Sequence, residues 1–238
     1  MKKLSNRFFF YIAVGIFAVF LVSQLLSKSS CSPDKTKQAI LAESGESVFA
    51  APTLYQPLKN VRIVLDPGHG GNDPGAIWED ICEKDITLQI SESLKQSLEK
   101  LGAVVFTTRD TDTYTALSDR IYIAQAKEAD AFISIHLNSL DEDPTVHGIE
   151  TYCTESVNQN NLPLAQAIHD SLIQETSAKD RKVRSDSDFY VVEKNTVPSC
   201  LIEVGFLTSE TERPLLLSAA YQDKLVSGIT NGLLEYFK

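Results

Sequence analysis

Short apolar runs alternate with longer helical patterns from Val61 onward, and this alternation constrains the fold more than any other feature of the chain. The apolar runs read VRIVL, AVVFTT, AFISIHL, GIETY, FYVV and CLIEVGF. Such alternation is typical of an α/β domain whose parallel or mixed sheet is covered by helices on both faces. The sequence therefore predicts one α/β domain over residues 61–238, with no internal repeat.

The clearest helical pattern begins at Glu83. It places one apolar stripe on the helix, formed by Ile86, Ile90, Leu94, Leu98 and Leu101. Gly102 stands where a glycine commonly ends a helix. Further helices are expected over residues 117–129, 162–176 and 220–237.

Residues 1–27 differ in kind from the rest of the chain. Lys2, Lys3 and Arg7 precede an uncharged run from Phe8 to Leu26, which as a helix would span about 30 Å of hydrocarbon. The basic flank predicts a cytoplasmic N-terminus and an extracytoplasmic remainder. The run is longer than a usual signal-peptide core and no small-x-small cleavage site directly follows. We therefore expect an uncleaved anchor in the cytoplasmic membrane; the alternatives are a cleaved signal and a buried core helix.

Residues 28–60 are rich in polar and small residues and are expected to form a flexible tether. Cys31 lies where a lipoprotein cysteine would stand, but residues 28–30 lack the leucine-led motif that lipidation usually needs. Cys82, Cys153 and Cys200 share no CxxC spacing, which argues against a zinc knuckle or a thioredoxin motif. Outside the cytoplasm one disulfide is compatible with these cysteines, and the sequence does not choose its partners.

The charge pattern excludes one class of partner. The net charge is −10, and no cluster of Lys or Arg with interleaved aromatic residues is present to neutralise phosphates. We therefore expect no nucleic acid to bind. The oligomeric state has no signature in the sequence, and a monomer is the default expectation.

Two histidines follow or close predicted strands. His69 lies in the glycine-rich segment DPGHGG directly after VRIVL, and His136 closes AFISIHL. Each has a simpler interpretation on its own, His69 as a bystander in a tight turn and His136 as a hydrogen-bonded core residue. Because the carboxyl ends of such strands line the ligand crevice of α/β sheets, two converging imidazoles predict half of a zinc site.

Two glutamates are candidates to complete this site. Asp80 and Glu83 have the spacing of a capping box, and from the residues alone we favour the cap for Glu83. If the helix start faces the crevice, Glu83 instead supplies a third zinc ligand. Glu203 interrupts LIEVGF, which otherwise resembles an interior strand. A carboxylate buried there would be paired, near a metal or functional, unless the strand alternates and exposes it.

These residues together resemble a known family. The segments DPGHGGNDPGA, TRDTDTYTALSDR, ADAFISIHLNS and PSCLIEVGFLTS, with Glu83 opening the helix after the first, have the order and spacing of zinc-dependent N-acetylmuramoyl-L-alanine amidases that cleave peptidoglycan. The resemblance implies a single α/β domain with a mixed, roughly six-stranded sheet. It also implies that His69, Glu83 and His136 bind one zinc ion and that Glu203 is the catalytic carboxylate, which overrides the capping interpretation.

The implied reaction is hydrolysis of the amide between N-acetylmuramic acid and L-alanine. The rival interpretations are another cell-wall zinc peptidase of the carboxypeptidase type and a wall-binding module without turnover, against which the retained Glu203 argues. Gln125, Lys182 and Ser209 depart from the family pattern, which has Asn, Gly and Asn there. For His147 and His169 we expect surface roles. Some relatives carry an inserted helix that plugs the crevice, and the interval from His136 to Glu203 is too short to predict one here.

Overall fold

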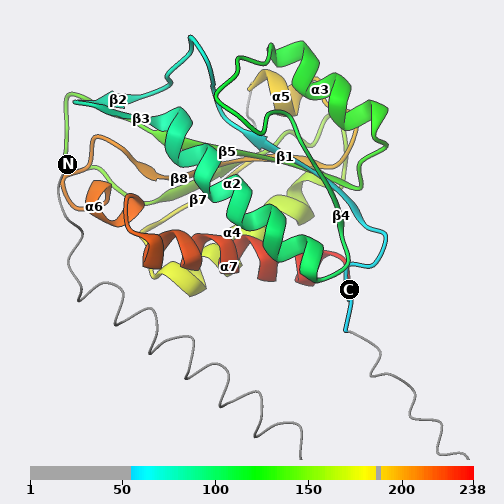
Figure 1. The fold of residues 1–238 in the computed structure, drawn as a ribbon. Coiled ribbons are helices and arrows are strands. Elements are labelled where there is room, and N and C mark those ends of the chain that lie inside the picture. Colours follow the sequence, from blue (N-terminus) through cyan, green and yellow to red (C-terminus); the bar gives the residue numbers. More distant parts are fainter. Residues whose placement is uncertain (1–54, 186–188) are drawn as a thin grey trace, which may run out of the picture. The chain divides into compact units, whose positions relative to one another are not determined.

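A mixed six-stranded sheet forms the middle layer of residues 55–185 and 189–238, the part of the chain that the computed structural model describes (Figure 1). Its strand order is β4 (Val104–Thr107), β1 (Arg62–Pro67), β5 (Ala131–Asn138), β8 (Ser199–Phe206), β6 (Ile149–Tyr152) and β7 (Asp180–Arg184). The first four strands are parallel, whereas β6 pairs antiparallel with β8 and parallel with β7. The predicted mixed, six-stranded α/β sheet is confirmed.

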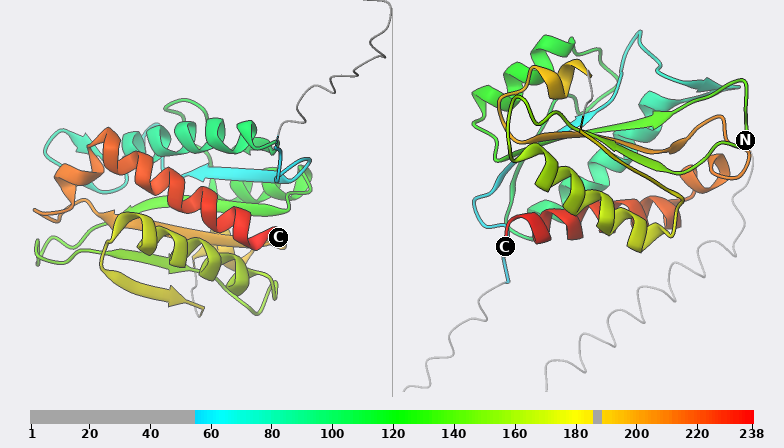
Figure 2. Two further views of the ribbon diagram at one scale, coloured as in Figure 1. Left: turned by 90° about the horizontal axis from the view of Figure 1, so that it is seen from below. Right: turned by 180° about the vertical axis from the view of Figure 1, so that it is seen from behind.

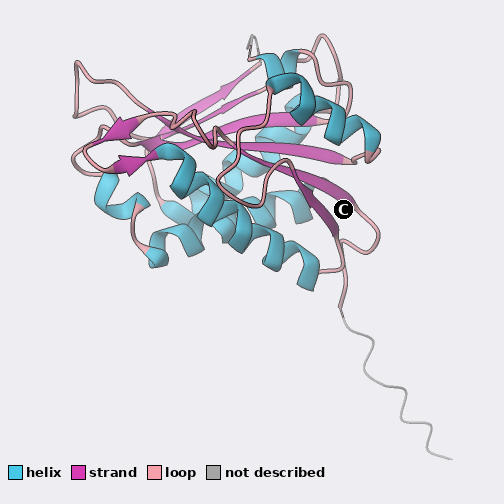
Figure 3. Cartoon of the chain, turned by 45° about the horizontal axis from the view of Figure 1, so that its top comes forward, coloured by secondary structure: helices cyan, strands magenta, loops and turns pink. Residues whose placement is uncertain are grey.

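Helices cover both faces of this sheet. The long helices α2 (Glu83–Lys100), α4 (Asn161–Thr176) and α7 (Ala219–Tyr236) lie side by side on one face, as the left view of Figure 2 shows. The other face carries α3 (Leu117–Ala126) and the single turn α5 (Tyr190–Glu193), and Figure 3 shows the strands between the two sets of helices. The expected helices are thus present, with ends within three residues of the predicted ones.

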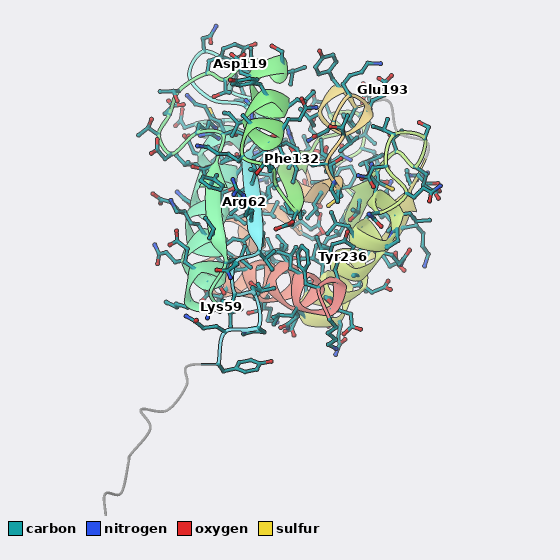
Figure 4. The ribbon with its side chains drawn as sticks, turned by 90° about the vertical axis from the view of Figure 1, so that its right-hand side faces the viewer. Lys59, Arg62, Asp119, Phe132, Glu193 and Tyr236 are labelled. Carbon is teal, nitrogen blue, oxygen red and sulfur yellow. The ribbon has the colours of Figure 1, made fainter. Side chains whose placement is uncertain are left out.

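The alternation of side chains along each strand produces two apolar clusters. In β1, Ile63 and Leu65 pack with the apolar stripe of α2 and with α4 and α7, whereas Val64 packs with Phe132 on the side of α3 and α5. Figure 4 shows Phe132 with Asp119 of α3 and Glu193 of α5 on one side and Tyr236 of α7 on the other. All eight residues of β8 are buried, which makes it an interior strand as predicted.

The region before Tyr190 differs from the prediction. The run FYVV was expected to be a strand, but Tyr190–Glu193 forms α5, and the sixth strand is β7 in the charged segment before it. As the edge strand, β7 alternates exposed and partly buried residues and carries the charges typical of protected edges. Lys182, which replaces the family's glycine, has φ 79, a conformation that suits glycine better than lysine.

Two small elements have no counterpart in the prediction. A two-stranded antiparallel hairpin joins β2 (Ile77–Trp78) and β3 (Ile81–Cys82) just before α2, and α6 (Arg213–Leu216) follows β8. Cys82, Cys153 and Cys200 are free. No helix among the described residues is long and apolar enough to cross a membrane. The predicted anchor and Cys31 lie outside the described residues, as does the predicted tether up to residue 54. At the end of that tether the prediction is wrong, because Leu58 is fully buried in the core and its N–H donates to the Leu101 carbonyl.

Candidate metal centre and active site

Three predicted ligands meet at the carboxyl end of the sheet. His69 follows β1, His136 lies in β5 and Glu83 is the first residue of α2. Glu83 Oε2 lies 3.2 Å from His69 Nε2, and Glu83 Oε1 lies 3.0 Å from His136 Nδ1. The three ligand atoms lie within 4.8 Å of one another, and the two imidazole rings meet edge to face. Two imidazoles and one carboxylate at these distances can hold a divalent cation and leave a fourth position open.

Glu83 does not cap its own helix. The N-cap residue is Cys82, and its side chain makes no capping hydrogen bond to α2. The Glu83 carboxylate instead accepts hydrogen bonds from the backbone N–H groups of Leu137 and Ala76, both at 2.8 Å. The capping-box interpretation is therefore wrong, because the side chain turns away from the helix and is held between β5 and the loop before β2.

The glycines around the histidines provide the space that the rings occupy. A Cβ atom on Gly68 would collide with the His136 ring, and one on Gly75 would collide with Glu83 and His69. His69 itself has φ 62, an uncommon conformation for a residue other than glycine. The sequence DPGHGGNDPG is thus required sterically at Gly68 and Gly75, where the backbone passes against the candidate ligands.

The pKa shifts of the three side chains indicate that the centre favours positive charge. Burial would lower the pKa of His69, but the carboxylates of Glu83 and Asp73 outweigh it and raise that pKa to about 9. Burial would also lower the pKa of His136, but the Glu83 carboxylate outweighs burial and raises that pKa. Burial would raise the pKa of Glu83, but the two histidines lower it overall. A buried carboxylate that gathers two cationic neighbours is suited to a metal cation.

Three residues that hold the His69 loop were not singled out from the sequence. Asp73 Oδ2 lies 2.9 Å from His69 Nδ1, the arrangement in which a carboxylate orients a metal-binding imidazole. Arg120 Nη2 donates to the His69 carbonyl, and Arg109 Nη2 donates to the Gly68 carbonyl, both at 2.8 Å. Both arginines come from TRDTDTYTALSDR, so this motif supports the loop. The four-residue spacing of His69 and Asp73 was the feature of the sequence that could have singled out Asp73.

Glu203 lies one strand away from His136. The two residues are register partners in the parallel pair of β5 and β8, so their side chains leave the same face of the sheet. Glu203 is 8% exposed, and its Oε2 atom has no hydrogen-bond partner among the described residues. Burial raises its pKa to about 7. An unsatisfied buried carboxylate oxygen beside the ligand cluster is the feature expected where a water or a substrate group binds.

A cavity of about 280 Å³ opens beside the two histidines on the side of α3. The residues around it are His69, His136, Asp66, Asp73, Tyr114, Thr115, Leu117 and Arg120. Tyr114 and Leu117 are 56% and 51% exposed, so this side of the centre offers apolar surface to a ligand.

The remaining histidines lie apart from this cluster. His147 is partly exposed, and its Nδ1 atom lies 2.8 Å from the Thr145 carbonyl. His169 was expected at the surface, and that expectation is wrong. It is 2% exposed and bonds Thr151 Oγ1 and Asp180 Oδ1 at 2.9 and 3.0 Å. His169 therefore connects α4 to β6 and β7 inside the fold.

The model of the N-acetylmuramoyl-L-alanine amidase family matches residues 63–235, which include every residue of the centre. The chain belongs to this family. It is a cell-wall N-acetylmuramoyl-L-alanine amidase, a hydrolase whose substrate class is peptidoglycan and which acts outside the cytoplasm.

Individual relatives agree with this assignment. The uncharacterized protein YqiI of Bacillus subtilis is 36% identical over 83% of this chain and 96% of its own length. The germination-specific N-acetylmuramoyl-L-alanine amidase of the same organism is 35% identical over 76% of this chain and 81% of its own. The structure of N-acetylmuramoyl-L-alanine amidase AmiC2 of Nostoc punctiforme superposes with a TM-score of 0.70 at 36% identity, over 74% of this chain and 96% of that one. Sequence and fold thus point to one family.

Proposed function

We propose that the amidase is a zinc enzyme in which His69, Glu83 and His136 hold a single ion and Glu203 is the catalytic carboxylate. The two-histidine, one-carboxylate set is a donor combination that zinc favours in catalytic sites, where water takes the fourth position. The observation that carries the proposal is the unsatisfied Oε2 atom of buried Glu203, one strand from His136. This oxygen needs a partner that the described side chains do not supply.

The residues of the chain divide the reaction between them. The chemistry that a zinc ion supplies is Lewis acidity toward a water molecule and toward the scissile carbonyl oxygen. Glu203 accepts a proton from the water while the water oxygen bonds to the lactyl carbonyl carbon. Glu203 then returns the proton to the L-alanine nitrogen as the C–N bond breaks. A pKa near 7 for Glu203 suits a group that takes up and releases a proton near neutral pH.

Metal analysis of single variants tests the ligand set. We expect one zinc per purified domain, and we expect His136→Ala to lose both metal and activity, because two protein ligands bind zinc poorly. His147→Ala is the matched control, since it removes a histidine outside the cluster and should change neither quantity. Full zinc occupancy in His136→Ala would remove that residue from the ligand set.

Product analysis tests the bond that is cut. Digestion of purified peptidoglycan should release intact stem peptides that begin with a free L-alanine amine, which mass spectrometry identifies. Loss of a C-terminal residue from the stem would indicate a carboxypeptidase, and binding without any product would indicate a wall-binding module.

We also propose that residues 1–27 anchor the amidase in the cytoplasmic membrane and that residues 28–54 tether its domain on the outer side. Lys2, Lys3 and Arg7 ahead of the uncharged run support this orientation. Fractionation of cells expressing the full chain should place it with the membranes, and deletion of residues 1–27 should remove it from them. A natural soluble form that begins after Leu26 would show a cleaved signal instead.

A further inference from the structure

A row of charged side chains crosses the sheet from the metal centre to its edge. His136 of β5 is the register partner of Glu203 of β8, and Glu203 is the register partner of Glu150 of β6. Arg181 and Arg184 of β7 both contact Glu150. The row therefore continues past Glu203 to two guanidinium groups at the edge of the sheet, on the same face as the metal centre.

The arginines at the end of this row exceed what Glu150 needs. Glu150 is buried, and its Oε2 atom accepts hydrogen bonds from Asn138 Nδ2 and Tyr152 Oη at 3.0 and 2.8 Å. Its Oε1 atom accepts one from Arg181 Nε at 3.0 Å. Arg184 Nη2 is farther away, at 3.5 Å, and the Arg184 side chain is 50% exposed. Glu150 is already satisfied without Arg184.

The charge balance at this edge also points to an anionic ligand. Two guanidinium groups share one buried carboxylate, so this group of three side chains carries one net positive charge. Arg181 is fixed further because its guanidinium lies 5.1 Å from the centre of the Phe206 ring. Arg184 thus lies near the buried Glu150 while half of its side chain is exposed, an arrangement suited to a bidentate contact with a carboxylate.

The spacing fits a peptide that leaves the scissile bond toward β7. Two strand spacings, about 10 Å, separate β8 from β7, and two extended residues span about 7 Å, to which a carboxyl-bearing branch adds. On the opposite side of the centre, the exposed Tyr114 and Leu117 offer apolar surface, while Arg120 is buried in its ion pair with Asp66. The two sides of the centre therefore differ in the substrate group that they accept.

We infer that Arg184 is a specificity-determining residue that binds a free carboxylate on the second residue of the stem peptide. The inference rests on the proposed function, because Glu203 marks the position of the scissile amide. The glycan part of the substrate then lies toward Tyr114 and Leu117, and the peptide runs across β8 and β6 to the edge strand.

A matched pair of soluble muramoyl tripeptides tests this inference. The two differ only in whether the α-carboxyl group of the second residue is free or amidated. With the zinc-loaded enzyme, Arg184→Gln should raise KM for the free carboxylate about tenfold, the scale of one charge-assisted hydrogen bond, and leave KM for the amide unchanged. Arg184→Lys should restore part of the preference, because it keeps the charge without the fork.

Lys182→Gln is the control, since Lys182 lies on the same strand, is 77% exposed and pairs with Asp180. It should leave both KM values as they are. Equal KM changes for the two peptides in Arg184→Gln, or no change in either, would overturn the assignment of Arg184. Turnover that persists without zinc or in Glu203→Gln would instead contradict the proposed function, so the two failures are distinguishable.

Discussion

Arg120 donates a hydrogen bond of 2.8 Å to the backbone carbonyl of His69, the first candidate metal ligand. The same guanidinium donates to Asp66 Oδ1 at 2.7 Å and to the Pro67 carbonyl at 2.9 Å. Arg120 and Asp66 are both buried, so this ion pair joins α3 to the end of β1. His69 occupies the left-handed region, and Arg120 stabilises the loop in that costly conformation.

Replacement of Arg120 by lysine should lower the affinity for zinc while the domain stays folded. Lysine keeps the charge but not the guanidinium, which reaches four acceptors, the Thr115 carbonyl included. We therefore expect zinc affinity to fall by about tenfold to a hundredfold. Competition with a chromophoric chelator measures this affinity, and circular dichroism follows the fold. Arg213→Lys is the control, because the Arg213 side chain contacts the Leu207 and Thr208 carbonyls and Trp78, none of which belongs to the centre. Unchanged zinc affinity in a folded Arg120→Lys domain would show that the loop needs no such support.

Conversion of Glu203 to glutamine separates metal binding from chemistry. The amide has nearly the same shape but cannot accept the water proton, so turnover should fall by about two orders of magnitude or more. Zinc content and melting temperature should stay near those of the parent, because Glu203 is outside the ligand cluster. The decisive measurement is the single-turnover rate at full zinc occupancy. A rate close to that of the parent would leave the proton transfer without a residue to perform it.

The elements that the sequence predicted well have long, consistent patterns. The apolar stripe of α2 and the continuous apolar runs of β1, β5 and β8 are each decided by burial on one or both faces. The segment around Tyr190 failed because a four-residue apolar run has no periodicity that separates a strand from one helical turn. β7 was missed because an edge strand buries few side chains and its charges resemble those of a loop.

The residues of the candidate site also differ in how well the sequence predicted them. His69 and His136 were found because strand ends mark the crevice of an α/β sheet. Glu83 was assigned wrongly from its residues alone, since a carboxylate at a helix start has the same spacing whether it bonds its own helix or a distant backbone N–H group. Arg109 and Arg120 support the His69 loop through its backbone carbonyls, and such contacts leave no pattern of side-chain types. The family resemblance supplied the candidate ligand set, and the ligand atoms of those three residues lie close together in the structure.

Buried His169 should contribute to stability and not to catalysis. Its ring joins Thr151 of β6 and Asp180 of β7, so His169→Ala leaves a buried hydroxyl without its partner and a gap under α4. We expect the free energy of unfolding to fall by about 1–3 kcal/mol, measured by urea denaturation. His147→Ala, at a partly exposed position, should stay within about 0.5 kcal/mol of the parent. Equal stabilities of the two variants would mean that the His169 hydrogen bonds add nothing net.

The chain between His136 and Glu203 determines whether the centre can be plugged. Its described elements are β6, α4, β7 and α5. The apolar residues of α4, including Leu164 and Ile168, pack in the cluster of Ile63 and Leu65 with α2 and α7. His136 lies on the opposite face of the sheet, that of Phe132. α4 is therefore part of the core and does not cover the ligands.

The isolated domain should accordingly be active without an activator. Among the described residues of this interval, each helix or strand packs on the sheet or extends it, and the histidines adjoin an open cavity of about 280 Å³. A tether-free domain that begins at Tyr55 and so keeps the buried Leu58, loaded with zinc, should release stem peptides from purified peptidoglycan at a rate that cell extract does not increase. The matched control is the Glu203→Gln domain, which shows how much release any contaminating hydrolase in the extract contributes. A domain that stays silent until extract is added, while its Glu203→Gln counterpart stays silent throughout, would require an inhibitory element that a partner displaces.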